Sequence, residues 1–195
     1  MAGFLKRTYW DLKDPIGRFN FGNAIWSRLP GLAGQELRGR VIPRYFAAAG
    51  TNIIIHEGVR FRGIHRLEVG DECHLGNGCF LQASGGITLG KRVIIGPDVR
   101  IWSINHVTTD THRPIADQGY HYENVVIGDD CWLGMAVIVL PGVHLPEGCV
   151  VSAGSVVGKK AYPAWSVLAG HPARVIQLRR AGDSTDVERT APAVD

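Results

Sequence analysis

The residues best suited to chemistry lie together in one polar segment in the second half of the chain. Asn105 and His106 open this segment, and His112 and His121 follow further along it. A histidine side chain titrates near neutral pH, so it can take a proton from a substrate and return it. The segment therefore predicts general acid–base catalysis, provided that a rigid element holds one of these histidines in place.

The chain around this segment is built on a six-residue repeat that predicts such an element. Each hexad opens with an aliphatic residue that is often followed by Gly. The twelve first positions are Val69, Leu75, Leu81, Leu89, Ile95, Ile101, Ile127, Leu133, Val139, Leu145, Val151 and Val157. A period of six does not match the period of an α-helix and suits short strands joined by tight corners. Three hexads would form one coil of a triangular prism, and the coils would stack through parallel-strand hydrogen bonds.

The fifth position of the hexad is small or β-branched, with Asn105 as the exception. Cys73, Cys79, Cys131 and Cys149 all occupy this position, which predicts structural packing rather than disulfides or a metal site. Glycine at the second position is expected to allow a corner geometry that a Cβ would hinder.

The repeat stops after Asn105 and resumes only near Val125. A solenoid tolerates insertions at its corners, so we expect residues 105–125 to protrude as a loop. Long loops in compact domains are often functional. His106 is the best placed of the three loop histidines because it closes a hexad, where the prism should fix its backbone.

The flanking segments predict the rest of the architecture. Residues 1–50 are expected to form helices and irregular structure, with the helix in 34–49 broken at Pro43, covering the open end of the prism or the substrate cleft. The remaining expected segments are a β-helix over 51–168, a short C-terminal helix over 169–180 and a disordered tail over 181–195.

Charge and hydropathy narrow the functional classes. The net charge is +3, and 45% of the residues are hydrophobic. Basic residues outnumber acids in residues 1–66, which suits an anionic substrate, a phosphate or a membrane surface, although an ordinary solvated face is the simpler reading. We recognise no nucleic-acid-binding motif, signal peptide or transmembrane segment, and therefore expect a cytoplasmic protein without a nucleic-acid partner.

Four motifs in this order resemble the hexapeptide-repeat acyltransferases, in particular the maltose/galactoside O-acetyltransferase and xenobiotic acetyltransferase group. The motifs are Ile95-Gly-Pro-Asp-Val-Arg-Ile leading into Asn105-His106, Val126-Ile-Gly-Asp-Asp-Cys-Trp-Leu-Gly, Pro141-Gly-Val with Val151-Ser-Ala-Gly-Ser-Val-Val, and Leu168-Ala-Gly-His-Pro-Ala-Arg-Val-Ile. The likeness covers about residues 50–178.

The resemblance implies an all-β fold, the left-handed parallel β-helix, which is an exception to the usual right-handed crossover. It implies a homotrimer with active sites between neighbouring prisms, acetyl-CoA as the donor and no metal. The implied reaction is O-acetylation of a sugar or of a surface-polysaccharide precursor. Because no Cys or Ser sits in an activated pair, the acceptor hydroxyl would attack the thioester directly, without an acyl-enzyme.

Roles follow from position in these motifs. The resemblance makes His106 the general base, and Asn105 the neighbour that orients the base or the substrate. The residues that match the coenzyme channel are Trp132, Gly134, Ala153, Gly154, Gly158, Lys159, Lys160 and Arg174. Gln82, one residue past the interior position of its hexad, is expected to touch the acceptor. The group that orients His106 stays open between Asp110, Glu123 and a backbone carbonyl.

Two positions depart from the family pattern and affect the coenzyme end of the site. Met135 follows Trp-Leu-Gly where relatives commonly have a small polar residue. Gln177 stands where relatives often have Arg or Lys, and Arg179 or Arg180 would have to supply that charge.

Two other classes of function remain open. The γ-type carbonic anhydrases use the same helix with three histidines on zinc, and His74, His106 and His112 form a loose parallel. A non-catalytic solenoid that only binds a partner is the second alternative, and the intact Asn105-His106 pair argues against it.

Overall fold

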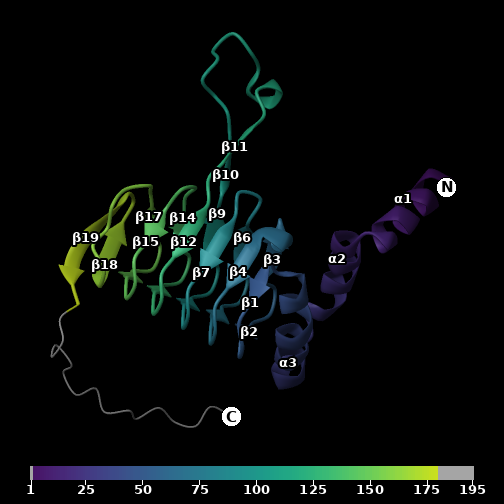
Figure 1. The fold of residues 1–195 in the computed structure, drawn as a ribbon, viewed down its shortest axis with the longest axis horizontal. Coiled ribbons are helices and arrows are strands. Elements are labelled where there is room, and N and C mark those ends of the chain that lie inside the picture. Colours follow the sequence, from purple (N-terminus) through teal and green to yellow (C-terminus); the bar gives the residue numbers. More distant parts are fainter. Residues whose placement is uncertain (1, 180–195) are drawn as a thin grey trace.

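The hexads fold into short strands that stack coil upon coil as a triangular prism (Figure 1). The computed structural model describes residues 2–179. Within them the strands form three stacks of five, seven and five strands, and a separate two-stranded hairpin. Neighbouring coils pair in parallel throughout the repeat, for example Leu75 with Ile95 and Ile95 with Leu133. The predicted left-handed parallel β-helix is therefore confirmed.

The three stacks are the faces of the prism. Sheet A consists of β1 (Ala48–Ala49), β4 (Leu67–Val69), β7 (Ile87–Leu89), β12 (Val125–Ile127) and β15 (His144–Leu145). Sheet B consists of β2 (Ile54–Ile55), β5 (His74–Leu75), β8 (Ile94–Ile95), β13 (Trp132–Leu133), β16 (Val150–Val151), β18 (Ser166–Gly170) and β19 (Ala173–Leu178). Sheet C consists of β3 (Arg60–Arg62), β6 (Phe80–Gln82), β9 (Arg100–Trp102), β14 (Ile138–Val139) and β17 (Val156–Val157).

The first position of each hexad fills the interior of the prism. Leu75, Ile101 and Leu133 are completely buried, and the other first positions are at most 3% exposed. Burying such a side chain contributes about 1.5–3 kcal/mol, so the repeat itself supplies the core. The four cysteines are free and buried, and burial raises the pKa of the Cys79 thiol to about 11. Their predicted packing role is confirmed.

The corners have a different chemistry from the one predicted. The left-handed backbone conformation falls on the fourth position of the hexad, where Glu72, Asp98 and Ala136 have φ near 55–60°. Glycine at the second position serves instead to let two coils approach, because a Cβ added to Gly134 would lie 2.7 Å from the Ala153 nitrogen. Second-position glycine therefore reflects stacking, while strain at the fourth position recurs along the prism.

The C-terminal helix predicted over 169–180 is wrong. Residues Ala173–Leu178 form β19, which pairs antiparallel with β18, and Pro172 lies in the turn between them. The edge of sheet B would otherwise present unpaired backbone groups, and pairing with β19 satisfies them where a helix could not. The tail predicted as disordered, residues 181–195, lies outside the described residues.

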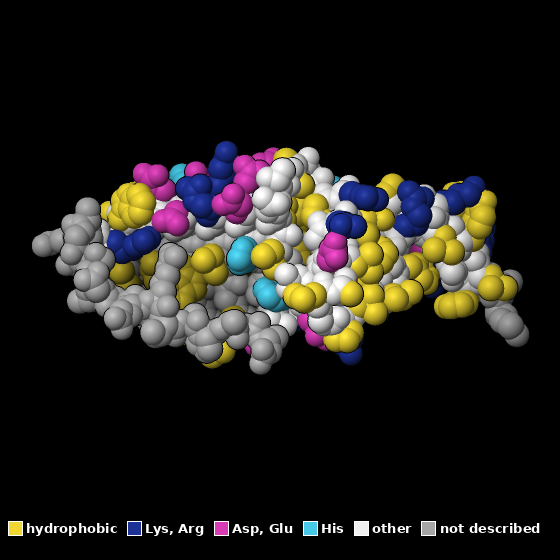
Figure 2. All heavy atoms as spheres, turned by 90° about the horizontal axis from the view of Figure 1, so that it is seen from below, with side chains coloured by type: hydrophobic (Ala, Val, Ile, Leu, Met, Phe, Trp, Pro, Cys, Tyr) yellow, Lys and Arg dark blue, Asp and Glu magenta, His cyan; other side chains and the backbone are white. Residues whose placement is uncertain are grey.

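Helices form the N-terminal end of the molecule, as predicted. They are α1 (Ala2–Lys13), α2 (Pro15–Trp26) and α3 (Gly31–Val41), followed by the 3-10 helix η1 (Ile42–Tyr45). Asp14 caps α2 by accepting a hydrogen bond from the Gly17 nitrogen. Phe19 of α2 is buried against Tyr45 and Phe61 and so docks this helix on the prism. α1 projects beyond the prism, and Figure 2 shows apolar side chains interspersed with Lys and Arg at this end.

Arg38 joins α3 to the first coil. It is 3% exposed, and its guanidinium donates hydrogen bonds to the carbonyl oxygens of Trp26, Leu29 and Ile55. No helix within residues 2–179 has the length and apolarity required to cross a membrane.

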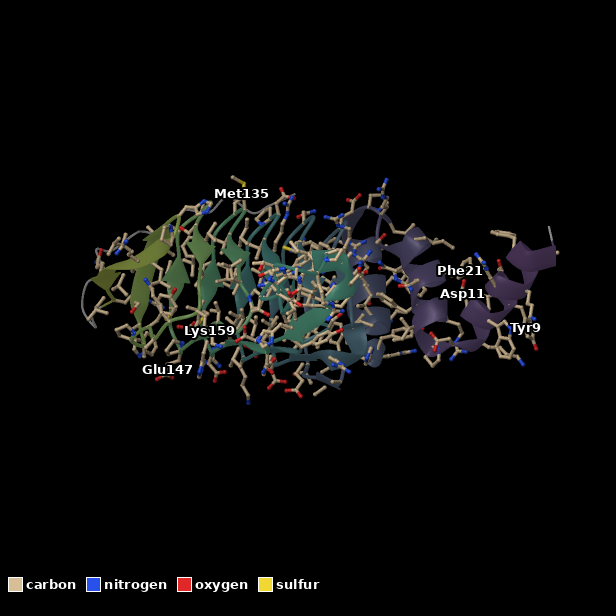
Figure 3. The ribbon with its side chains drawn as sticks, turned by 90° about the horizontal axis from the view of Figure 1, so that it is seen from above. Tyr9, Asp11, Phe21, Met135, Glu147 and Lys159 are labelled. Atoms are coloured by element: carbon tan, nitrogen blue, oxygen red, sulfur yellow. The ribbon has the colours of Figure 1, made fainter. Side chains whose placement is uncertain are left out.

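Two edges of the prism differ in the residues that form them. The hairpin edge is the corner at which sheet C turns into sheet A, residues 63–66, 83–86, 103–124, 140–142 and 158–161. The glycine edge is the corner at which sheet B turns into sheet C, residues 56–59, 76–79, 96–99, 134–137 and 152–155. The third edge is the corner at which sheet A turns into sheet B, and it contains Glu147. Figure 3 shows Met135 of the glycine edge and Glu147 on opposite sides of the prism, with Lys159 of the hairpin edge between them.

Candidate active site

The interruption of the repeat forms a β-hairpin that stands out from the hairpin edge (Figure 1). Its strands are β10 (Ile104–His106) and β11 (Tyr120–Tyr122), with the 3-10 helix η3 (Ile115–Asp117) between them. The sequence predicted that His106 would close a hexad inside the prism, and this is wrong. The chain leaves sheet C at Trp102, and His106 is held by pairing with Tyr120 across the hairpin.

The hairpin is anchored at its base by a buried serine. Ser103 is fully buried, its hydroxyl donates to the Gln82 carbonyl at 2.7 Å, and that hydroxyl accepts from the Gly85 nitrogen at 2.9 Å. The returning strand is tied to the same residue, since the Glu123 nitrogen donates to the Ser103 carbonyl. These bonds fix the hairpin to the coil before it, so the rigidity that catalysis requires comes from Ser103 and strand pairing.

A charged network braces the other side of the hairpin base. Lys159 forms an ion pair with the Glu123 carboxylate, and the His121 ring lies 3.3 Å from the same carboxylate. The hydrogen bond from Lys159 holds the pKa of Glu123 below its usual range, with smaller contributions from His121. Glu123 therefore stabilises the base of the hairpin and does not orient the His106 ring.

Beside the hairpin lies a cavity of about 750 Å³. It is lined by Ile16, Phe19, Asn20, Phe61, Arg62, Gly63, Ile64, Gln82, Ser84, Trp102, Ile104, Asn105, His106 and Tyr120. Helix α2 provides one wall, sheet C the second and the hairpin the third. A concave site with aromatic walls and a few polar groups is the usual form of a small-molecule site.

The cavity brings together three of the residues predicted from the sequence. His106, Asn105 and Gln82 all line it. The His106 ring packs on Tyr120 with a centroid distance of 4.5 Å. The Gln82 side chain is nearly buried, and its carbonyl oxygen accepts a hydrogen bond from the Ser84 hydroxyl at 2.9 Å. The Gln82 NH2 group has no hydrogen-bond partner among residues 2–179, so it is free to donate to a ligand.

Sequence reasoning missed several lining residues. Arg62, Trp102 and Tyr120 belong to segments far apart in the chain, and nothing in the local pattern singles out Tyr120. Arg62 and Trp102 share one signal, because each follows the interior residue of its strand, the same place that Gln82 holds in β6. Of the aromatic residues in the N-terminal segment, Phe19 lines the cavity, whereas Tyr9 and Trp10 lie exposed on α1.

The candidate orienting groups do not reach His106. Asp110 accepts from the His112 nitrogen at 2.9 Å, and Gln118 bonds the Asp110 backbone. Across the part of the chain that the structure describes, no hydrogen bond to the His106 ring is found. The observed neighbour is the Tyr120 ring, which packs against the imidazole at an interplanar angle of 41°.

The predicted coenzyme residues divide between two edges. Ala153 and Gly154 lie on the glycine edge with Gly134 stacked one coil away, and Trp132 is 51% exposed on the adjoining sheet B. Gly158, Lys159 and Lys160 lie on the hairpin edge instead. A Cβ added at Gly154 or at Gly158 would meet nothing within 4 Å, so both backbone segments are open to a ligand.

Lys160 and Arg174 meet at the C-terminal end of the prism. The Lys160 ammonium donates to the Ala173 carbonyl at 2.8 Å, next to exposed Arg174 on β19. Arg179 is engaged elsewhere, since it donates to the Gly148 carbonyl at 2.7 Å and lies over the Trp165 ring. Because its guanidinium already makes these contacts, Arg179 is a poor replacement for the positive charge that relatives often carry at the position of Gln177. Arg180 lies outside the described residues.

The histidines of the zinc alternative do not meet. His74 lies on sheet B, while His106 stands on the hairpin at another edge. Among residues 2–179 there is no group of three His, Cys, Asp or Glu side chains that could hold a metal ion.

Comparisons with known proteins agree with this geometry. A family model described as the hexapeptide repeat of succinyl-transferase matches residues 67–83 and 124–159. A relative from Escherichia coli K12, provisionally named colanic acid biosynthesis acetyltransferase WcaF, is 32% identical over 142 residues, which cover 73% of this chain and 75% of that protein. A provisionally named acetyltransferase from Mycobacterium tuberculosis H37Rv is 33% identical over 149 residues, 76% of this chain, but the chain spans only 47% of its length.

A solved structure extends the likeness to three dimensions. The structure of a galactoside acetyltransferase in complex with coenzyme A superimposes with a TM-score of 0.69 at 25% identity, covering 78% of this chain and 74% of that one. The repeat, the hairpin at its corner and these relatives lead to one conclusion. The chain belongs to the hexapeptide-repeat acyltransferase family, among its acetyltransferases.

Proposed function

We propose that this protein is an acetyl-CoA-dependent O-acetyltransferase that acetylates a hydroxyl of a sugar or of a surface-polysaccharide precursor. The observation that carries the proposal is the cavity in which His106, Asn105 and Gln82 meet beside Trp102 and Tyr120. Aromatic walls suit the apolar face of a sugar ring, and the amides suit its hydroxyls. The named relatives are acetyltransferases, and the galactoside acetyltransferase was solved with coenzyme A.

His106 acts as the general base. A sugar hydroxyl is a weak nucleophile until a base removes its proton, and an imidazole is matched to this task near neutral pH. As the proton passes to an imidazole nitrogen, the hydroxyl oxygen attacks the thioester carbonyl carbon and the carbon–sulfur bond breaks. The imidazolium then returns the proton to the departing thiolate. No acyl-enzyme is needed, because all four cysteines are buried in the prism.

Acetyl-CoA fits the open backbone of the glycine edge. Ala153 and Gly154 are exposed, and the Gly154 nitrogen donates to the Met135 carbonyl, which leaves the Ala153 N–H for an extended pantetheine arm. Trp132 offers an exposed apolar face nearby, and Lys160 with Arg174 offers cations for phosphates at the C-terminal end of the prism. Gly158 lies beside Lys159 and Lys160 with open space around it.

The division of the site between two edges favours a homotrimer. One chain carries the base at its hairpin edge and the coenzyme surface at its glycine edge, with the face of sheet C between them. In a closed ring of three copies, the hairpin edge of one prism meets the glycine edge of the next, so each interface completes one site. We place the reaction in the cytoplasm, where acetyl-CoA is made.

Release of CoA thiol by the purified full-length chain tests the proposal. Acetyl-CoA is supplied with a panel of glycosides, and we expect CoA release that depends on the glycoside together with an alkali-labile acetyl ester in the product. The control is the same panel without protein. CoA release that is independent of every hydroxyl acceptor, or transfer to amines alone, would refute O-acetylation of sugars.

A further inference from the structure

Three residues on successive coils form a ladder along one wall of the cavity. Arg62 pairs in register with Gln82, and Gln82 pairs with Trp102. Each is the last residue of its strand in sheet C, so the three residues lie beside the hairpin edge, where all three line the cavity. Adjacent coils are about 4.8 Å apart, which puts the Arg62 backbone about 10 Å from that of Trp102.

The charge of the cavity comes from this ladder. Apart from His106, Arg62 is the single ionisable cation among the residues that line it, and neither Asp nor Glu lines the cavity within the part of the chain that is described. A guanidinium stays protonated at every physiological pH. The cavity is therefore positive at the end remote from the hairpin.

Arg62 lacks the side-chain contacts that Arg38, Arg60 and Arg66 make. Arg38 donates to three backbone carbonyls, Arg66 donates to the Ser84 carbonyl, and Arg60 lies over the Phe80 ring. The Arg62 side chain makes no hydrogen bond or ion pair with any of residues 2–179, and it is exposed. A free guanidinium presents a planar fork of donors that matches a carboxylate or a phosphate in two-point contact.

Neighbouring groups support the same ligand chemistry. The Gln82 NH2 group is one coil away and has no hydrogen-bond partner among residues 2–179, while the Ser84 hydroxyl donates to its carbonyl oxygen and holds the amide in place. It is a second donor aimed at an acceptor oxygen. Trp102 on the third rung and Phe19 on α2 provide the aromatic walls for the sugar ring itself.

We infer that the acceptor is an acidic sugar, whose carboxylate or phosphate is bound by Arg62 while a hydroxyl of the same molecule lies at His106. This inference rests on the proposed function, since it names the class of acceptor for that site. Arg62 is a specificity-determining residue: it sets which sugar binds, and His106 performs the proton transfer.

Matched acceptor pairs test the inference. Full-length protein is assayed with saturating acetyl-CoA on p-nitrophenyl glucuronide against p-nitrophenyl glucoside, on p-nitrophenyl galacturonide against the galactoside, and on glucose 1-phosphate against methyl glucoside. Because a charge-assisted hydrogen bond contributes more than a neutral one, the acidic member should have a kcat/KM about tenfold or more higher. The pair with the larger gain identifies the anion as carboxylate or phosphate.

Variants of one strand provide the controls. Arg62→Gln should lower kcat/KM for the acidic acceptor to near that of its neutral partner, acting mainly on KM, and Arg62→Lys should keep part of the preference. Arg60→Gln removes the same charge two residues away, outside the cavity, and should leave the preference unchanged. Equal kcat/KM within every pair, or a preference that survives Arg62→Gln, would overturn the inference.

A direct measurement of sugar binding distinguishes failure of this inference from failure of the proposed function. Isothermal titration of the same acceptors into His106→Ala protein measures affinity without turnover. Arg62-dependent binding of the acidic sugar supports the inference even if no sugar is acetylated. Acetylation of neutral and acidic sugars alike, with equal binding, supports the transferase and refutes the acidic acceptor.

Discussion

The hairpin edge and the glycine edge are built from the same hexad, yet they carry opposite kinds of chemistry. The hairpin edge presents side chains, with His106, Gln82 and Arg62 around a cavity. The glycine edge presents backbone, with small residues that let coils stack closely and leave Ala153 and Gly154 open. The corner with the insertion brings polar side chains such as His106 to a cavity. The uninterrupted corner keeps small side chains and an open backbone, which suit the extended coenzyme proposed there.

The comparison also bears on the proposed homotrimer. The proposed base and the proposed coenzyme surface are separated by a sheet face in one prism, and a neighbouring copy would bring the two edges together. Variants at each edge test the role proposed for that edge.

The largest effect should come from removing the base. His106→Ala should lower kcat by about a hundredfold or more, because the acceptor hydroxyl then lacks a proton acceptor. Steady-state kinetics measure the loss, and circular dichroism checks the fold. His112→Ala is the matched control, since His112 lies on the same insertion but away from the cavity. Near-normal activity of His106→Ala with loss in His112→Ala would move the base to His112.

Mixing two inactive variants tests whether two copies share a site. Ala153→Trp should block the glycine edge at an exposed position, and His106→Ala removes the base at the other edge. Trimers refolded from equal amounts of both should regain about a quarter of the sites, each with the base from one copy and the coenzyme surface from the next.

The measurement is acetyl transfer by the mixed protein against each variant alone. Two His106→Ala chains with separate tags, refolded together, serve as the control. Failure of the mixture to exceed its parents, with mixed trimers demonstrated by the tags, would place the whole site within one chain.

A smaller effect is expected from the coenzyme end. Arg174→Ala should raise the KM for acetyl-CoA about tenfold with little change in kcat, because one phosphate contact is lost without disturbing the base. Arg40→Ala is the control, since Arg40 pairs with Glu36 on α3, at the opposite end of the prism from β19. A fall in kcat at unchanged KM would contradict a role for Arg174 in binding coenzyme.

The smallest effect concerns the hairpin base. Lys159 lowers the pKa of Glu123, so the charged pair stabilises the fold above the ordinary carboxyl pKa, and this contribution disappears as pH falls through the lowered value. Lys159→Gln should raise the Glu123 pKa in an NMR titration and lower Tm slightly at pH 7, with the difference from wild type vanishing in acid. An exposed pair contributes about 1 kcal/mol or less. An unchanged Glu123 pKa would refute the coupling.

Much of the fold was predictable because the prism is made of local, repeated choices. Aliphatic first positions such as Leu75 and Leu133 specify the interior, and the interruption marks the corner that carries the hairpin. The prediction of a C-terminal helix failed because residues 173–178 can also pair, as a strand, with the open edge of sheet B. That edge exists only after the coils have stacked, so the sequence of the segment alone does not reveal it.

The sequence by itself determined the parallel β-helix, the buried cysteines and the place where the repeat is interrupted, at Asn105-His106, because each depends on a short repeat or a break in it. Tertiary structure decided how His106 is held, through Ser103 and Tyr120, and which residues share its cavity. Arg62, Gln82 and Trp102 are twenty residues apart at each step and meet because one coil has that length. The separation of the hairpin edge from the glycine edge was also decided by tertiary structure. The chain visits the two corners in turn, and only the stacking of closed coils collects each kind of corner into its own edge.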